Sequence, residues 1–308
     1  MGGTGRSGTT VTARLLGSHP SLTLIPYEVR FIGAAGGLGD LLAGHCSLEG
    51  FVGRLRGPWY RRGGSGRGGL HRLIEEDPYA AAVGRFVDGA ASDLARAAGG
   101  LVADLLDPLA EAGGWVEHTP EGMRVAAEVG RVVPDARWIN VVRDGRDVAA
   151  SVVAKPWGPH DPVEAVRWWA RRVLRGAHAA ESLGDRVLTV RLERLVSDHD
   201  VAASLFDHVG LEIGPTVQAY LTDHVTEAAS NTERWRSEPR ADEIDRAYQA
   251  ARAWLVSDPV ARGVDALLGP PVGSEGLRRE IRAQERWVEK ADRADARRLR
   301  RLDRRASE

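Results

Sequence analysis

The chain has 308 residues, a formal net charge of −1 and a single cysteine, Cys46. This length allows a large core in one big domain or two small ones, and the near-zero charge excludes a general affinity for nucleic acid. A lone cysteine excludes an internal disulfide and a thiolate metal cluster. With no apolar run of membrane-spanning length and no signal peptide, the sequence predicts a cytoplasmic protein without a membrane span.

A glycine-rich turn opens the chain and runs into a helical pattern over residues 9–17. Glycines let several backbone N–H groups converge on one anion, and the helix N-terminus and nearby hydroxyls add further donors. The lysine that nucleoside triphosphatases place before Ser/Thr is missing, and Arg6 stands inside the turn instead. A guanidinium fork suits a terminal oxyanion and needs no metal bridge. The predicted anion-binding residues are Gly5, Arg6, Ser7, Gly8, Thr9 and Thr10.

A buried strand normally comes directly before a turn of this kind, yet this turn starts at Gly2. The sequence therefore predicts that the first strand is lost or that the true start lies upstream, with Met1 at a strand position. A missing first strand would affect the stability of the fold more than the chemistry of the site.

The first third of the chain mixes short regular elements with glycine-rich connections. Residues 22–25 form a short apolar run that predicts a strand. Residues 33–75 are loop-rich around a helical stretch near 48–55, and the glycine cluster at 63–69 is interpreted equally well as a lid over an acceptor site or as a tolerated insertion. Residues 78–112 have helical spacing throughout.

A second anion-binding signal lies far downstream. The apolar, β-branched run over residues 137–142 predicts a strand that ends in Arg143, and the helical stretch after it carries Ser151. Ligands of open α/β sheets bind at the carboxyl ends of parallel strands. Arg143 and Ser151 are therefore expected to contact one anion.

Strands and helices continue to alternate through the second half of the chain. Strands are predicted at 115–116 and 187–192, and helices at 122–132, 163–182 and 198–209. This alternation predicts an α/β fold, a doubly wound parallel sheet flanked by helices. Because adjacent helix positions cannot face one core, one of Trp168 and Trp169 is expected in the core and the other in a cleft or interface.

The tail from Glu275 to Glu308 is crowded with Arg, Asp and Glu around a sparse apolar stripe. Because both charge signs are interspersed, it is interpreted as a solvated helix with many i,i+4 ion pairs. The alternative is a helix that pairs two copies in a homodimer or lies on a membrane surface.

Together these motifs resemble the sulfotransferases that use 3′-phosphoadenosine-5′-phosphosulfate (PAPS). That family has an R-S-G-T-T type loop, like Arg6–Thr10, for the 5′-phosphosulfate, and a strand-end Arg with a helical Ser, like Arg143 and Ser151, for the 3′-phosphate. Residues 116–120 look like its E-K-T-P segment, and residues 190–196 like its Y-E-D-L strand end. The resemblance implies a P-loop-like sulfotransferase domain over 1–270, followed by a charged helical tail over 271–308. It further implies sulfuryl transfer from PAPS, without a metal, to a hydroxyl of an unidentified small molecule, sugar or lipid.

The resemblance also suggests catalytic residues. The segment Pro26-Tyr27-Glu28-Val29-Arg30 resembles the G-E-E-T-R segment of protein-tyrosine sulfotransferases. It implies that Glu28 is the general base and that Arg30 faces the acceptor or tunes Glu28. The alternative is a structural ion pair between the two. Arg6 and the loop amides would stabilise charge on the transferred group.

His118 stands where the family often has a lysine that bridges the leaving oxygen and the sulfonate. A protonated histidine can take that role, with a charge that depends on pH. A second base and a cap for the following turn are equally open interpretations.

A late segment around residues 231–236 resembles the basic segment that closes over the nucleotide in many relatives. It implies that Arg234 or Arg236 meets the 3′-phosphate and that Trp235 stacks on adenine. The alternative is an exposed pair of arginines flanking a packed tryptophan. Leu192 stands where some relatives carry a tyrosine that helps bind adenine, so the resemblance does not imply that contact here.

Two other functional classes remain open from the residues alone. A P-loop kinase-like phosphotransferase shares the anion-binding turn, but it needs the lysine and a strand-end aspartate, for which Asp104 and Asp107 are poor candidates. A non-catalytic nucleotide-binding protein would keep the anion site and lack turnover.

Overall fold

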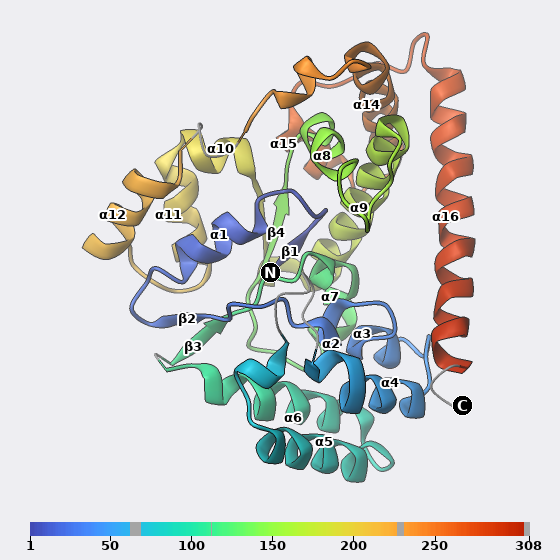
Figure 1. Cartoon of the computed structure of the whole chain (residues 1–308). Helices are drawn as coiled ribbons and strands as arrows, with labels where there is room; N and C mark the ends of the chain where they lie inside the picture. Colours follow the sequence, from blue (N-terminus) through green and yellow to red (C-terminus); the bar gives the residue numbers. More distant parts are fainter. Residues whose placement is uncertain (62–68, 112, 227–230, 305–308) are drawn as a thin grey trace.

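The computed structural model describes the whole chain except residues 62–68, 112, 227–230 and 305–308 (Figure 1). All of the described strands run parallel. The order β1-β4-β5 is formed by β1 (Gly2–Gly3), β4 (Trp138–Val142) and β5 (Val187–Arg191). A second pair is formed by β2 (Leu22–Leu24) and β3 (Gly114–Val116). The amine of Met1 donates a 2.7 Å hydrogen bond to the carbonyl oxygen of Glu117, just beyond β3, and so joins the two groups of strands.

Helices cover both faces of this sheet (Figure 1). Along β4, Val141 packs into the apolar cluster that contains α1, whereas Val142 packs into the cluster of α8 and α9, as the alternation of side chains along a strand requires. The predicted doubly wound parallel sheet flanked by helices is therefore confirmed. One face is covered by α1 (Thr9–Leu16), α11 (His199–His208) and α12 (Pro215–His224); the other is covered by α8 (Gly145–Val152), α9 (Pro162–Leu183), α14 (Ala241–Ser257) and α15 (Arg262–Leu268).

The two leading glycines belong to a strand. Gly2 lies opposite Asn140 and Gly3 opposite Val141 in the parallel register. A Cβ on Gly3 would lie 2.4 Å from the Val141 carbonyl oxygen and 2.5 Å from Ser7 Oγ, so only glycine fits between the strand and the following loop. The expectation that no strand precedes the loop is wrong for these two residues.

An all-helical layer lies beyond β2 and β3. Two helices, α5 (Glu76–Ala90) and α6 (Leu94–Leu106), pack along each other where the sequence showed uninterrupted helical spacing. The helical segment is divided in two because Asp93 starts a new helix: its carboxylate accepts a 3.0 Å hydrogen bond from the Arg96 N–H and caps α6.

The region predicted to be loop-rich is more helical than expected. It contains α3 (Leu38–Leu42), α4 (Leu48–Arg54) and a turn at Leu55–Trp59 that is kinked at Gly57, with Phe51 and Leu55 fully buried. Most of the second glycine cluster, residues 62–68, lies outside the described residues, and its role as a lid stays a prediction.

Several shorter helices connect these layers, and none of the helices in the described part of the chain is long and apolar enough to cross a membrane. They are α2 (Arg30–Gly33), α7 (Ala126–Val129), α10 (Leu192–Ser197) and the 3-10 helices Leu70–Arg72, Asp107–Leu109, Pro120–Val125, Gly184–Arg186 and Arg234–Ser237.

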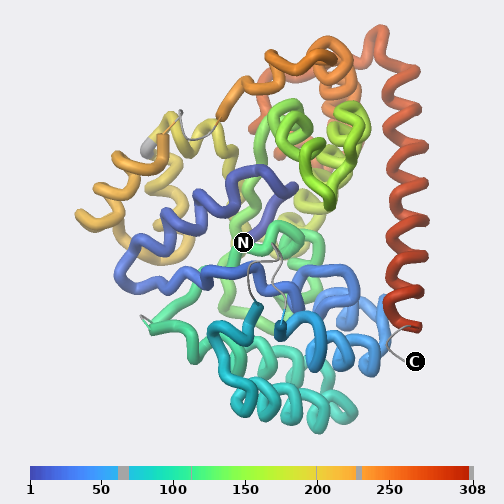
Figure 2. The backbone as a smooth tube through the Cα atoms, viewed as in Figure 1, coloured from blue at the N-terminus to red at the C-terminus, as the bar shows by residue number. Residues whose placement is uncertain are grey.

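The charged tail forms one long helix, α16 (Arg278–Arg304), which runs along the flank of the molecule from α14 past α9 to α4 (Figure 2). Its ion pairs go mostly to other elements: Arg171 on α9 contacts Asp292 at 2.5 Å and Asp295 at 2.6 Å. At its far end Asp303 accepts a 2.6 Å hydrogen bond from the Ser47 hydroxyl. Among the described residues, one i,i+4 ion pair lies within α16. The tail is a largely solvated helix, as predicted, but the expectation of many i,i+4 pairs within it is wrong.

Removing the Arg171 guanidinium should loosen α16. Arg171 is 7% exposed, whereas its two aspartate partners are about half-exposed, so Arg171→Ala should cost about 1–2 kcal/mol of stability. Amide hydrogen exchange across 278–304 should become faster than in the parent protein. Arg293→Ala removes an exposed arginine with one long contact and is the matched control. Equal exchange in the two variants would show that Arg171 does not anchor the helix.

Candidate functional site

The loop between β1 and α1, residues 4–8 and called the phosphate loop below, has the backbone of an anion-binding turn. Gly5, Arg6 and Gly8 have positive φ angles of 78°, 58° and 98°. Consecutive left-handed residues turn neighbouring N–H groups toward one point, where the N-terminus of α1 adds partial positive charge. Gly8 is required for a further reason, because a Cβ there would lie 2.5 Å from Leu192 Cδ1. Thr9 and Thr10 begin α1 directly after this loop.

The structure brings this loop to the two residues predicted from the downstream motif. The Nε of Arg6 donates a 2.8 Å hydrogen bond to Ser151 Oγ on α8. Arg143, which follows β4 and is 8% exposed, donates from Nη1 to the carbonyl oxygen of Arg6 at 3.3 Å. Three side chains that are separated by up to 145 positions in the sequence therefore meet at one edge of the sheet.

The late segment lies beside Arg143. Arg143 Nη2 donates a 2.8 Å hydrogen bond to the carbonyl oxygen of Asn231. The carboxylate of Asp147, 3% exposed, accepts from the backbone N–H groups of Glu233 at 2.9 Å and Trp235 at 3.3 Å. Sequence reasoning missed this role of Asp147. The available signal was its position four residues after Arg143, whose guanidinium lies 3.8 Å from the Asp147 carboxylate.

Within the late segment the tryptophan is packed and the arginines are exposed. Trp235 is 7% exposed, and the guanidinium carbon of Arg146 lies 4.3 Å from its ring centroid. Arg146 is itself held by Asp144 at 2.7 Å and Asp245 at 2.5 Å. This arrangement matches the alternative of two exposed arginines flanking a packed tryptophan. Contact of Arg234, Trp235 and Arg236 with a nucleotide stays a prediction.

The carboxyl ends of β2 and β3 bring Glu28 and His118 to the same edge of the sheet. Glu117 ties the two segments together. Its Oε1 accepts from the Val29 N–H at 3.2 Å, from the Thr119 N–H at 2.7 Å and from the Thr119 hydroxyl. One buried carboxylate therefore fixes the residues that directly follow Glu28 and His118. The sequence shows Glu117 only as part of a motif, because its partner Val29 is 88 positions away.

The surroundings of Glu28 raise the pKa of its carboxyl. Burial raises the pKa of its carboxyl, and the charges of Glu121 and Glu117 raise it further, against a smaller opposing effect of Arg30. Within the described residues, Glu28 forms no hydrogen bond or ion pair with Arg30, which acts on it only through its charge. The structure therefore gives no support to the structural ion-pair alternative.

Two buried polar atoms in the site have no partner among the described residues: Nδ1 of His118 and Oγ of Ser7. His118 is 8% exposed and Ser7 is fully buried. An unsatisfied buried polar atom costs about 1–3 kcal/mol, so each is suited to a bound ligand that supplies the missing hydrogen bond. Burial lowers the pKa of His118, which keeps the ring neutral near pH 7 in the free protein.

Of the two adjacent tryptophans of α9, one lies in the core and the other does not, as expected. Trp169 is fully buried, and its indole N–H donates a 3.1 Å hydrogen bond to the Arg143 carbonyl oxygen, which fixes the end of β4. Trp168 is half-buried and faces the phosphate loop at Gly5.

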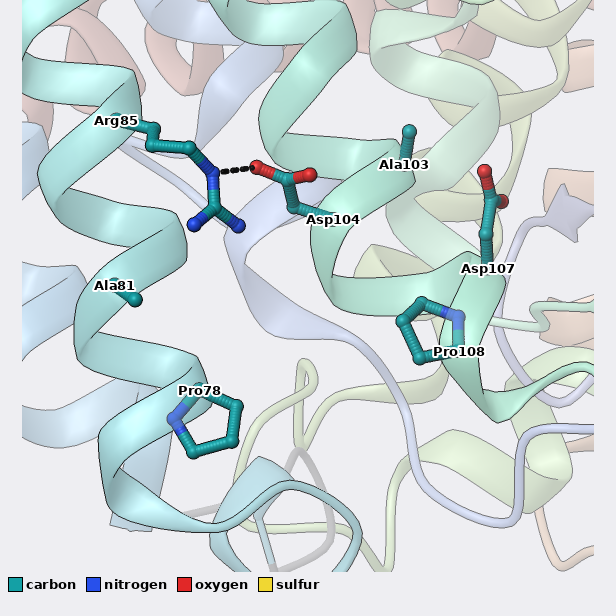
Figure 3. A pocket seen from close by; sticks show the side chains of 7 residues that line it. All are labelled: Pro78, Ala81, Arg85, Ala103, Asp104, Asp107 and Pro108. Atoms are coloured by element: carbon teal, nitrogen blue, oxygen red, sulfur yellow. Dashed lines mark hydrogen bonds and ion pairs between the residues drawn. The ribbon is translucent and has the colours of Figure 1, made fainter.

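A cavity of about 530 Å³ lies elsewhere, between α5 and α6 (Figure 3). In it Arg85 forms a 2.8 Å ion pair with Asp104. Asp107 accepts a 2.9 Å hydrogen bond from the Trp115 indole. Neither aspartate follows a strand at the edge that holds the phosphate loop, so Asp104 and Asp107 are not placed as a kinase-like aspartate would be. The lining residues are Pro78, Ala81, Arg85, Ala103, Asp104, Asp107 and Pro108.

Comparison with known proteins identifies the family. A model of the sulfotransferase family matches residues 56–215, more than half of the chain. The chain belongs to the sulfotransferase family. Among solved structures it is similar to the sulfotransferase domain of the olefin synthase from Synechococcus PCC 7002, with 20% sequence identity and a TM-score of 0.47, over 79% of this chain and 90% of that one. A search of curated proteins found no match.

The match to the sulfotransferase family includes His118, Arg143 and Ser151. The phosphate loop, Glu28 and the late segment lie outside the matched residues, so their assignment rests on the geometry above. In the part of the chain that the structure describes, no three His, Cys, Asp or Glu side chains gather in a way that could hold a metal ion.

Proposed function

We propose that this sulfotransferase transfers a sulfuryl group from PAPS to a hydroxyl group of an acceptor, without a metal ion. The contact between Arg6 and Ser151, beside the guanidinium of Arg143, is the observation that carries the proposal. A single phosphate needs only the loop. A donor with a phosphosulfate at one end and a 3′-phosphate at the other needs two anion-binding groups side by side, and this arrangement supports such a donor.

The residues that would hold the donor follow from this geometry. The N–H groups of the loop, Arg6 and the hydroxyl of Ser7 suit the 5′-phosphosulfate, since Ser7 Oγ is buried without a partner among the described residues. Arg143 and Ser151 suit the 3′-phosphate. When bound, PAPS supplies the sulfuryl group and a 5′-phosphate as the leaving group. Charge on sulfuryl oxygens is expected to be stabilised by Arg6 and the preorganised loop amides.

Glu28 and His118, after β2 and β3, would carry out the proton transfer and hydrogen-bond donation of the reaction. Glu28 would accept the proton of the acceptor hydroxyl, and its raised pKa brings its basicity closer to the operating pH. Arg30 would face the acceptor. His118 would donate a hydrogen bond from Nδ1, and anions held by the loop would favour its charged form. Glu117 would keep both segments in register through its three accepted hydrogen bonds.

Nucleotide affinity tests the donor assignment. The protein should bind adenosine 3′,5′-bisphosphate far better than AMP. A hydrogen bond to a charged group is worth about 1.5–3 kcal/mol, so Arg143→Ala should weaken the bisphosphate roughly ten- to a hundredfold. Calorimetry measures both quantities. Arg137→Ala, at the opposite end of β4, is the matched control and should change neither.

Transfer assays distinguish this proposal from the other functional classes. A sulfotransferase moves radiolabel from PAPS to an acceptor in the presence of EDTA. A kinase-like enzyme requires magnesium and ATP, and a binding protein shows affinity without turnover. Equal affinity for AMP and the bisphosphate would contradict the donor assignment.

A further inference from the structure

Two tryptophan rings stand against the start of the phosphate loop. Trp157, on the segment after α8, is 54% exposed. Its ring centroid lies 6.1 Å from that of Trp168 on α9, with an angle of 42° between the ring planes. A Cβ built on Gly5 would lie 3.5 Å from the Trp168 ring and 3.6 Å from the Trp157 ring. The two rings therefore form an aromatic wall directly beside Gly5.

Arg172 fixes the inner ring of this wall. Its guanidinium carbon lies 4.2 Å from the centroid of Trp168. Its two terminal nitrogens donate to the Thr4 carbonyl oxygen at 3.3 Å and to Glu121 Oε1 at 3.2 Å. Trp168 is thus held by a side chain that is itself bonded to the phosphate loop. The outer ring, Trp157, keeps more than half of its surface in water, although large aromatic side chains are normally covered.

A chain of contacts joins the wall to the candidate base Glu28. Glu121, the partner of Arg172, is close enough to Glu28 for its charge to act on that carboxylate. The other end of the loop is different, because Gly8 there packs against Leu192. Arg143 and the late segment, which suit the nucleotide, are joined to each other through Asn231. The exposed ring of Trp157 therefore neighbours the start of the loop. Trp168, Arg172 and Glu121 link it to the candidate base.

We propose that Trp157 and Trp168 form the acceptor-binding surface and that the acceptor is a phenol or another compound whose hydroxyl is carried by a flat aromatic ring. The inference rests on the proposed function and adds the class of acceptor. Two tilted indoles offer stacking and edge-to-face contacts to a flat ring. The charged group beside them, Arg172, already uses two of its five N–H donors on Thr4 and Glu121, which leaves fewer for the many hydroxyls of a sugar.

Binding of a simple aromatic alcohol tests this inference without turnover. The protein is first saturated with adenosine 3′,5′-bisphosphate, and 2-naphthol, cyclohexanol and glucose are then titrated by calorimetry. We expect 2-naphthol to bind more tightly than the other two. Trp157→Ala should weaken 2-naphthol by about tenfold, the loss of one aromatic contact and its buried area, whereas Trp157→Phe should keep most of the affinity. With 2-naphthol as acceptor, the alanine variant should raise KM more than it lowers kcat.

The control is Leu267→Ala, which removes the other large exposed apolar side chain of the described residues, on α15. It should leave 2-naphthol affinity unchanged. The inference is overturned if Trp157→Ala also leaves that affinity unchanged, or if glucose or cyclohexanol binds as well as 2-naphthol. It is also overturned if Trp157→Ala weakens the bisphosphate instead, because the ring would then stack on adenine. Failure of the parent protein to bind the bisphosphate would refute the proposed function itself, a result that calorimetry without 2-naphthol reveals first.

Discussion

Replacing Glu28 with glutamine should lower kcat by about a thousandfold, within the range that general base catalysis contributes. Affinity for adenosine 3′,5′-bisphosphate should stay the same, because Glu28 lies outside the phosphate loop and the Arg143 site. Glutamine keeps the size and the polarity of the side chain but cannot accept the acceptor proton. Turnover with saturating PAPS and calorimetry with the bisphosphate measure the two effects separately.

The control for this substitution is Glu49→Gln, in the first turn of α4, which should leave both quantities unchanged. The parent enzyme should also lose activity on the acid side at a pH above the ordinary range of a glutamate. Burial and then the neighbouring carboxylates raise the pKa of Glu28, so protonation removes the base at a higher pH than usual. A variant that loses folding or nucleotide binding would show that Glu28 is structural.

Replacing His118 with alanine should lower kcat by about a hundredfold, as loss of one donor to transition-state charge does in other enzymes. Burial lowers the pKa of His118 in the free protein, so a charged ring depends on bound anions that favour the imidazolium. The rate with saturating PAPS should then fall on the alkaline side as His118 loses its proton. His118→Lys should keep activity and move this limb to higher pH, since an ammonium keeps its charge longer.

The measurement is the pH profile of kcat in the parent protein and both variants. If the alkaline limb is the same in all three proteins, His118 does not act as a charged donor. Unchanged turnover in His118→Ala would assign the residue to packing or capping.

The strand-end residues were predictable because their signals are local. The pattern around residues 137–151 contains a strand, a turn and a helix in one continuous stretch, and parallel strands place their carboxyl ends together whatever the long-range contacts are. The sequence alone therefore places Arg143 and Ser151 near Arg6, and the hydrogen bond from Arg6 to Ser151 confirms their proximity.

The supporting residues were not predictable for the opposite reason. Glu117 accepts from Val29 across 88 positions, and Asp147 accepts from Glu233 across 86. Nothing in the local pattern of an acidic residue says which distant N–H it will meet. The docking of α16 was missed for the same reason. In the sequence, Asp292 and Asp295 are as compatible with i,i+4 pairs inside α16 as with pairs to another helix, and only the folded structure shows that they pair with Arg171 on α9.

The left-handed backbone conformation of Arg6 affects which residues selection keeps at this position. A side chain other than glycine at a φ of 58° costs about 1 kcal/mol or more, and the loop adopts that conformation without a glycine. Selection for thermal stability alone would drive position 6 toward glycine or asparagine, which tolerate the left-handed region. The proposed binding of the donor by its guanidinium gives a reason for an arginine to persist there. Engineering that optimises the melting temperature of this enzyme would therefore tend to remove the group that is proposed to bind its donor.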